Sequence, residues 1–356
     1  MLAAAAHLKK DIRAFISSYG NTGGEQAYMN MLNLAGLLQF QNGLSFIKGS
    51  FNPLGNDNFI PTDYHGANGL CGLELSKHPD VPRVGADAPV RPSHNVMRDV
   101  ELPPSLRDTP LKEGGFWAPS PRGLSSADDW GSTKHDSLKE GDTNNNPNTV
   151  QTIYELIKKH KNVKYIAIGP LTNLALLFDR FPDAADFIDE LIIMGGGFDI
   201  SNVENNAEYN FGADPAAVAK VLASPVKKVI APLDMTHKLA FSREEIEDIT
   251  GVKQNDLTED MSDVFNVFAK IFYLNYATSV KNGNEGAIIH DAATVAYLID
   301  KSKCDVQRYK ITSDEYGAVK KHSPDCVSGH DVFVINDIDR DFMKGLLREC
   351  FFKLKK

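Results

Sequence analysis

A histidine and an aspartate stand side by side in GAIIHDAATVAYLID, residues 286–300, where an apolar segment begins. The carboxylate of Asp291 is a ligand of the kind that Ca²⁺ prefers, because this cation binds oxygen atoms. The imidazole of His290 titrates in the right range to protonate a leaving group. A plainer alternative makes Asp291 the N-cap of a helix over 292–299 and His290 a loop residue. This segment alone leaves both interpretations open.

Two further segments carry polar groups of ambiguous meaning. In GPLTN, residues 169–173, Thr172 and Asn173 present a hydroxyl, an amide and backbone carbonyls at the start of a helix. The alternative there is a turn followed by a helix cap. In DYHGANGL, residues 63–70, His65 lies before a glycine-rich turn, and a single histidine indicates little by itself.

The segment MGGGFDISNVENNAEYN, residues 194–210, combines glycines with amides and a carboxylate. The glycines let the backbone approach a ligand closely. Asn202, Glu208 and Asn210 suit a ligand with several vicinal hydroxyls, such as a sugar. A polar surface loop is the alternative.

Short apolar strands alternate with helices along the chain. Strands are expected at 163–168, 190–196, 227–234 and 332–336, and helices at 214–223, 242–249, 259–280 and 339–353. Asp214 followed by proline is typical of a helix start, and Ser242 with Glu245 forms a capping box. Apolar strands separated by helices indicate a mainly parallel sheet covered on both faces, which is an α/β fold.

Ligands of such folds bind beyond the carboxyl ends of the strands. The five expected strand ends are 17–21, 167–173, 192–197, 231–237 and 287–291, and together we call them the rim. Each carries glycine, asparagine, threonine, aspartate or histidine. The rim is therefore the predicted site.

Composition excludes several classes of protein. The chain has 356 residues and a net charge of −9, which disfavours nucleic acid as a partner. No apolar run approaches the length that spans a bilayer, and the four cysteines form no CxxC pair. We expect a cytoplasmic protein with one domain, 1–356, interrupted by a polar surface insertion at about 84–149.

The motifs together resemble those of the inosine–uridine-preferring nucleoside hydrolase family. The matching segments are GNTGGEQAYMN (20–30), YHGANGL (64–70), AIGPLTNLA (167–175), MGGGF (194–198), AEYNFGADPAA (207–217), LDMTHK (233–238) and IHDAATVAYL (289–298). They cover most of the chain apart from 84–149. The resemblance implies a Rossmann-like fold and hydrolysis of a ribonucleoside to ribose and a free base.

The resemblance also implies roles for individual residues. A bound calcium ion would hold the nucleophilic water and the ribose hydroxyls, with Asp291 as a ligand through its carboxylate and Thr172 through its backbone oxygen. His290 would donate a proton to the leaving base. The substrate-binding residues would be Asn21, lining the site, His65, near the base or the 5′ side, Met194, packing beside the ribose, and Asn202, Glu208 and Asn210, binding its hydroxyls. The family further implies a homodimer or homotetramer.

One departure from the family pattern concerns the metal. The family's first strand ends in an aspartate cluster, DxDxGxDD, which supplies most metal ligands and the general base, and this sequence lacks that strand and motif. Asp291 and Thr172 give too few oxygens for a cation that takes about 6–8. We therefore expect poor calcium binding and low activity, and we interpret the missing strand as an N-terminal truncation. The alternative is a non-catalytic relative that binds nucleoside or ribose.

Two questions stay open in the sequence. A serine or cysteine hydrolase using His290 is a rival reading, but no GxSxG motif appears. Base preference is unreadable, because the aromatic residues of 259–280 fit either base stacking or a plain core. Those residues are Phe268, Phe272, Tyr273 and Tyr276.

Overall fold

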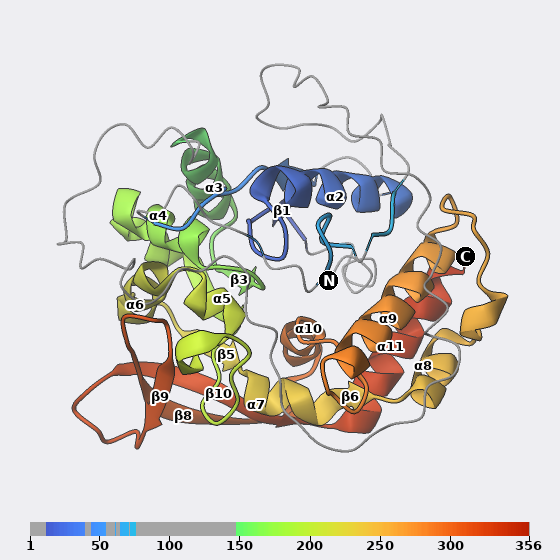
Figure 1. Ribbon diagram of the computed structural model, residues 1–356. Helices are drawn as coiled ribbons and strands as arrows, with labels where there is room; N and C mark the ends of the chain where they lie inside the picture. The colour runs from blue at the N-terminus through green and yellow to red at the C-terminus, as the bar shows by residue number, and fades with distance from the viewer. Residues whose placement is uncertain are drawn as a thin grey trace.

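The computed structural model describes residues 12–39, 44–54, 61, 65–70, 72–75 and 147–355. Nearly all of the predicted insertion lies outside them. The largest sheet has six strands in the order β3-β4-β5-β10-β8-β9 (Figure 1). These strands are β3 (Val163–Ala167), β4 (Ile188–Met194), β5 (Lys228–Ala231), β8 (Cys304–Ser313), β9 (Val319–His322) and β10 (His330–Ile338).

The sheet is parallel from β3 to β10 and antiparallel at its other edge, where β10 pairs with β8 and β8 with β9. This arrangement confirms the predicted α/β class. The four strands expected in this sheet are β3, β4, β5 and β10. The sequence does not predict β8 and β9, because most side chains of β8 are polar or partly exposed and lack the apolar run of a buried strand.

Two smaller pairs of strands complete the sheet structure. Strands β1 (Ala14–Ile16) and β2 (Ser45–Ile47) are parallel, and β6 (Ala240–Phe241) pairs antiparallel with β7 (Ala287–Ile288). Helix α2 (Gly24–Leu37) packs on the first pair through Tyr28 and Leu32 (Figure 1). Asn173 ties this pair to the rest of the fold, since its Nδ2 donates to the Ser17 carbonyl at 3.1 Å. Its Oδ1 accepts from the Ser50 amide at 2.9 Å.

Helices cover both faces of the six-stranded sheet (Figure 1). Neighbouring residues of β4 show this, because Ile192 belongs to one hydrophobic core while Leu191 and Ile193 belong to the other. Successive side chains of a strand point to opposite faces. The helices of one core are α3 (Pro147–His160), α4 (Thr172–Arg180) and α6 (Pro215–Ala223), and those of the other are α8 (Arg243–Thr250), α9 (Val264–Lys281), α10 (Ala292–Ile299) and α11 (Arg340–Leu354).

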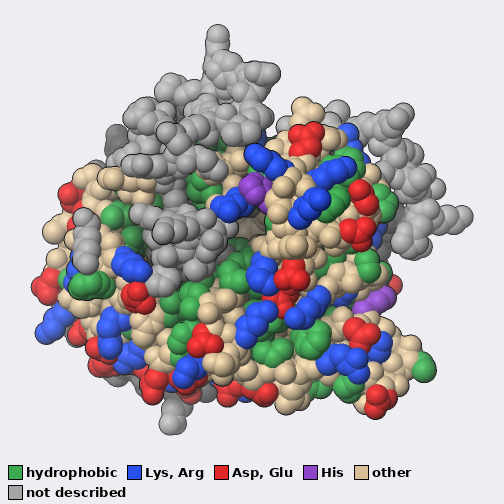
Figure 2. All heavy atoms as spheres, turned by 180° about the vertical axis from the view of Figure 1, so that it is seen from behind, with side chains coloured by type: hydrophobic (Ala, Val, Ile, Leu, Met, Phe, Trp, Pro, Cys, Tyr) green, Lys and Arg blue, Asp and Glu red, His purple; other side chains and the backbone are tan. Residues whose placement is uncertain are grey.

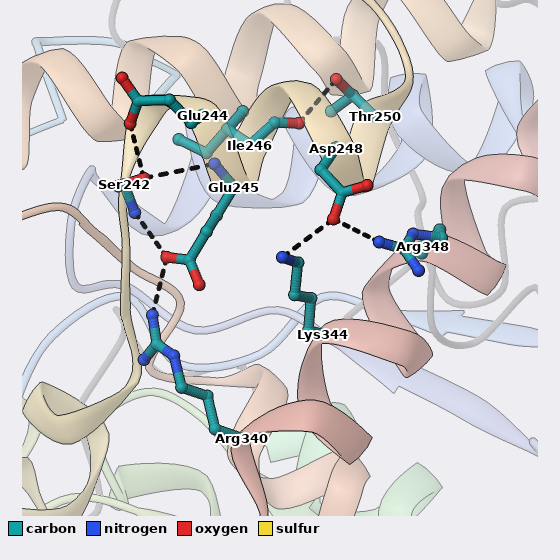
Figure 3. Close-up of polar contacts among 9 residues, drawn as sticks. All are labelled: Ser242, Glu244, Glu245, Ile246, Asp248, Thr250, Arg340, Lys344 and Arg348. Carbon is teal, nitrogen blue, oxygen red and sulfur yellow. Dashed lines mark hydrogen bonds and ion pairs between the residues drawn. The ribbon is translucent and has the colours of Figure 1, made fainter.

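The predicted caps are confirmed. Asp214 caps α6 by accepting from the Ala217 amide at 3.0 Å. Ser242 and Glu245 form the capping box of α8 (Figure 3). The same Glu245 carboxylate accepts from Arg340 at 2.8 Å, so the cap of α8 also binds the first turn of α11.

Replacing Ser242 by alanine is expected to lower the free energy of unfolding by about 1 kcal/mol, the usual cost of losing an N-cap hydroxyl. Urea denaturation measures the change. Ser201→Ala, at an exposed loop position, is the control and should change stability by less than about 0.5 kcal/mol. Equal effects of the two substitutions would show that the capping box contributes no specific stability.

A buried carboxylate lies near the start of β4, at the opposite end of the strand from the rim. The side chain of Glu190 is 1% exposed and binds Lys227 at 2.8 Å and Lys301 at 2.7 Å. It also accepts from the Tyr297 hydroxyl at 2.9 Å. Burial by itself raises the pKa of Glu190, but these hydrogen bonds outweigh it and lower the pKa from 4.5 to about 2.

Because the folded-state pKa of Glu190 is depressed, its contribution to stability is present above pH 4.5 and is lost as the pH falls towards 2. We expect Glu190→Gln to lower stability at pH 7 by about 1–3 kcal/mol and to reduce the loss of stability between pH 4.5 and 2. Glu349→Gln, which removes a surface ion pair with Lys353, should cost less than about 1 kcal/mol. Denaturation curves at several pH values test this, and identical acid profiles for Glu190→Gln and the unchanged chain would contradict it.

Charged side chains of both signs lie on the face of the molecule shown in Figure 2. Basic and acidic side chains are interspersed on the face shown in Figure 2, so that face offers no continuous basic stripe for a phosphate backbone. In the part of the chain that the structure describes, no helix has the length and apolarity needed to cross a membrane.

Candidate functional site

Backbone contacts bring the strand ends together at the rim. The Leu233 amide donates to the Gly196 carbonyl at 2.9 Å, which joins the ends of β4 and β5. The Tyr209 hydroxyl donates to the Gly20 carbonyl at 2.7 Å, which brings residues 17–21 to the same region. The contact of Tyr19 with Thr172, at 2.7 Å, and that of Thr236 with His290, at 2.7 Å, link the remaining rim segments.

Glu208 is a buried acidic residue that lies next to the rim segment 192–197. Its side chain is 2% exposed and is the N-cap of α5 (Tyr209–Gly212). It accepts from the amides of Asn210 at 2.9 Å, Gly196 at 3.0 Å and Phe211 at 3.2 Å. Burial raises the pKa of Glu208 to about 7, against the lowering effect of these three N–H groups and with a further increase from the negative charge of Asp291. Glu208 is thus no surface-loop residue, and it lies close enough to Asp291 for their charges to interact.

Asp291 stands at the N-cap position of α10, yet its carboxylate accepts no capping hydrogen bond. Its backbone carbonyl, by contrast, accepts from the Thr294 hydroxyl at 2.7 Å. Burial raises the pKa of Asp291 to about 6. The simple capping alternative is therefore wrong for this side chain, because no capping hydrogen bond occupies its carboxylate.

His290 belongs to a group of three histidines. Its ring centroid lies 5.6 Å from that of His237, and its Nδ1 lies 2.7 Å from the Thr236 hydroxyl. Burial lowers the pKa of His290 to about 3, helped by the charges of His237 and His65. The sequence reasoning gave His237 no role, although the LDMTHK motif contains it. Its sequence neighbours gave no reason to expect the contact with His290.

The hydroxyl of Thr172 is occupied by hydrogen bonds within the protein. It donates to Asp214 Oδ2 at 2.6 Å and lies 2.7 Å from the Tyr19 hydroxyl. Asp214 Oδ2 also accepts from the Leu54 amide at 3.0 Å. The role predicted for Thr172 therefore rests on its backbone carbonyl alone.

The other residues predicted to bind substrate fall into a buried group and an exposed group. Asn210 is buried, and its Nδ2 donates to the Met194 carbonyl at 3.1 Å, so these two residues lie together beside Glu208. Asn202 is exposed, and its Oδ1 accepts from the Tyr209 amide at 2.8 Å. Asn21 is also exposed. The buried group thus consists of Met194, Glu208 and Asn210, with the two asparagines at its margin.

The described residues do not complete a calcium site. Among residues 12–39, 44–54, 61, 65–70, 72–75 and 147–355, no group of three or more His, Cys, Asp and Glu side chains could hold a metal ion. The carboxylate of Asp291 and the carbonyl of Thr172 fall short of about six to eight oxygens.

The aromatic residues of α9 belong mostly to the core. Phe272 and Tyr273 are buried, and Phe268 and Tyr276 pack against the same cluster. The Tyr273 hydroxyl donates to the Val252 carbonyl at 2.7 Å, away from the rim segments. Packing accounts for these residues without a bound base.

The chain has a mainly parallel sheet, with carboxylates, amides and histidines where its strands end, which is the edge at which α/β folds bind their ligands. The family model for inosine-uridine preferring nucleoside hydrolases matches residues 1–344. The chain therefore belongs to that family, as its motifs predict.

Curated relatives carry the same kind of name. The pyrimidine-specific ribonucleoside hydrolase RihA of Shewanella oneidensis is 30% identical over 241 residues, which are 65% of this chain and 73% of the relative. RihA of Citrobacter koseri is 26% identical over 299 residues, 83% of this chain and 73% of the relative. A probable ribonucleoside hydrolase of Dictyostelium discoideum is 29% identical over 226 residues, 58% of this chain and 65% of the relative.

Solved structures share the fold. The purine-preferring ribonucleoside hydrolase from Gardnerella vaginalis superposes with a TM-score of 0.70 at 19% identity, covering 99% of this chain and 94% of that one. The plant nucleoside hydrolase PpNRh1 superposes with a TM-score of 0.67 at 19% identity, covering 98% and 94%. At these identities the likeness establishes the fold.

Proposed function

We propose that this chain binds a ribonucleoside at the rim and hydrolyses its N-glycosidic bond. Water adds across that bond, so that hydroxide joins C1′ of ribose and a proton joins the departing base. The observation that carries the proposal is the electrostatic interaction of Glu208 with Asp291, which directly follows His290 in the chain, together with the contact between the rings of His290 and His237. Membership of the nucleoside hydrolase family supports the same reaction.

Glu208 suits a ribose hydroxyl. An ionised carboxylate offers about four acceptor positions, and three backbone amides occupy the side chain of Glu208, so about one remains for a hydroxyl donor. Asn210 and Met194 lie beside it, and Asn202 and Asn21 extend the polar surface at the margin. We assign the ribose to this group of residues.

The charges suit a transition state with positive charge at C1′. Asp291, ionised at pH 7 with a pKa of about 6, would stabilise that charge, and Glu208, with a pKa of about 7, would add to it in its ionised fraction. His290, with a lowered pKa, is neutral at pH 7, so its help to the base would be a hydrogen bond from a neutral imidazole. This modifies the role that the family resemblance implies, in which His290 gives up a proton as an acid.

Calcium-bound water is the nucleophile that the family resemblance implies, and it stays a proposal for this chain. The described residues supply an incomplete set of ligands, and the printed sequence lacks DxDxGxDD. We therefore propose slow turnover. The same observation favours a second candidate, a non-catalytic relative that binds nucleoside or ribose without cleaving it.

Location, domain organisation and assembly concern the whole molecule. We propose a cytoplasmic protein with a single domain that assembles as a homodimer or homotetramer. Sedimentation velocity at several concentrations measures the assembly directly. A single species with the mass of one chain would contradict it.

One experiment separates the two candidate functions. The chain is incubated with inosine or uridine, with and without a chelator, and ribose and base are quantified by chromatography while calorimetry measures nucleoside binding. Equal amounts of ribose and base support hydrolysis, and a loss of both with chelator supports a metal. Binding without release supports the non-catalytic candidate. The absence of both binding and release would contradict the site itself.

A further inference from the structure

We propose that Thr236 is a positioning residue for His290. Its hydroxyl holds the imidazole at Nδ1, which makes Nε2 the nitrogen that meets the leaving base. This inference rests on the proposed function, because it concerns the departure of a base at the rim. Neither the family motifs nor the capping rules that predicted other residues assign this threonine a role.

The hydroxyl of Thr236 has a fixed position. The residue ends α7 (Leu233–Thr236), directly after β5, and is 1% exposed. Its amide donates to the Pro232 carbonyl at 3.1 Å. A threonine side chain is stiff because it branches at Cβ. The 2.7 Å contact from Oγ1 to Nδ1 of His290 therefore fixes the ring and not the reverse.

Two contacts of Oγ1 bear on which atom donates. Oγ1 of Thr236 lies 2.7 Å from Nδ1 of His290 and 3.3 Å from the Leu233 carbonyl, which also accepts from the His237 amide. A hydroxyl has one hydrogen, and we assign it to the shorter contact, the one to Nδ1. In a neutral ring, acceptance at Nδ1 leaves the N–H on Nε2, which is the nitrogen needed to donate to a base.

The residue that follows this short helix also supports one side of the ring. His237 follows Thr236 directly, and its ring is tilted by 51° to that of His290 at 5.6 Å. This ring contact restrains the position of the His290 ring but does not determine which of its nitrogens carries the hydrogen. The hydroxyl of Thr236 determines that, so a substitution that removes only the hydroxyl tests its effect on the tautomer of His290.

The test compares Thr236→Val, which keeps the shape and removes the hydroxyl, with Thr236→Ser, which keeps the hydroxyl. The substrates are uridine, inosine and p-nitrophenyl β-D-ribofuranoside, whose nitrophenolate leaves without help. For Thr236→Val we expect kcat on the nucleosides to fall about 10–100-fold, as for other residues that orient a working histidine. KM and the rate on the nitrophenyl riboside should change little, and Thr236→Ser should recover most of the lost rate.

A second measurement does not depend on activity. In the histidine-labelled chain, ¹⁵N chemical shifts of His290 should show hydrogen on Nε2, and Thr236→Val should give a mixture of both tautomers. Thr250→Val is the matched control, because Thr250 is equally buried and bonds the Ile246 carbonyl in α8. It should alter neither the shifts nor the ratio of rates.

Two results would overturn the inference. One is an unchanged nucleoside rate and tautomer in Thr236→Val, and the other is an equal loss on all three substrates, which would indicate structural damage. If the unchanged chain cleaves no substrate, the proposed function fails instead. The ¹⁵N shifts then still decide whether Thr236 orients His290.

Discussion

Replacing His290 by alanine is expected to lower kcat on uridine and inosine by about 10²–10⁴-fold, the usual contribution of a positioned proton or hydrogen-bond donor. The reason is that the leaving base develops negative charge with no donor to relieve it. Steady-state kinetics with chromatographic detection of the base measures the effect.

The control for this prediction is His160→Ala, at the exposed end of α3, which should leave kcat unchanged. The rate of the unchanged chain should also show no step near pH 6.5 from His290, because its pKa is lowered to about 3. A His290→Ala chain with the activity of the unchanged protein would remove this residue from the chemistry.

Replacing Asp291 by asparagine is expected to abolish ribose release and, in the presence of chelator, to make the protein more stable at pH 8. Burial raises the pKa of Asp291 from 3.8 to about 6, so the folded state favours its protonated form. Its contribution to stability is therefore present below pH 3.8 and is lost as the pH rises through 6. Asparagine does not ionise, and we expect a gain of at most about 3 kcal/mol at pH 8.

Thermal unfolding from pH 4 to pH 8 in chelator measures this gain. The two chains should converge at low pH and separate as the pH rises. Asp325→Asn, at an exposed loop position, serves as the control and should change stability by less than about 0.5 kcal/mol at every pH. A less stable Asp291→Asn chain at pH 8 would show that Asp291 supports the fold, contrary to its assignment to a ligand.

Local rules predict the parts of the fold that depend on neighbouring residues. Asp214 and Ser242 are capping residues as expected, because the groups they bind lie within three positions in the chain. The buried parallel strands are recognisable for the same reason, since their apolar runs are local. Strand β8 was not predicted because it pairs with residues of β10 that lie 19 to 34 positions further along the chain, from Ile311 with His330 to Cys304 with Ile338.

The sequence predicts which segments form the candidate site, but it does not predict the contacts between them. The strand ends identify where Glu208 and Asp291 occur, but their electrostatic proximity joins residues 83 positions apart and exists only in the folded chain. The contact of Thr236 with His290, 54 positions later, is equally invisible in sequence. Asn202 is exposed and Asn210 is buried. The two side chains are identical, so the sequence does not show this difference.

The most direct test mixes an excess of the chain with uridine and follows a single turnover by chromatography. We predict that ribose and uracil appear together in equal amounts with the unchanged chain, more slowly with His290→Ala, and not at all with Asp291→Asn. Release at an unaltered rate by both variants would place the chemistry elsewhere and contradict the account.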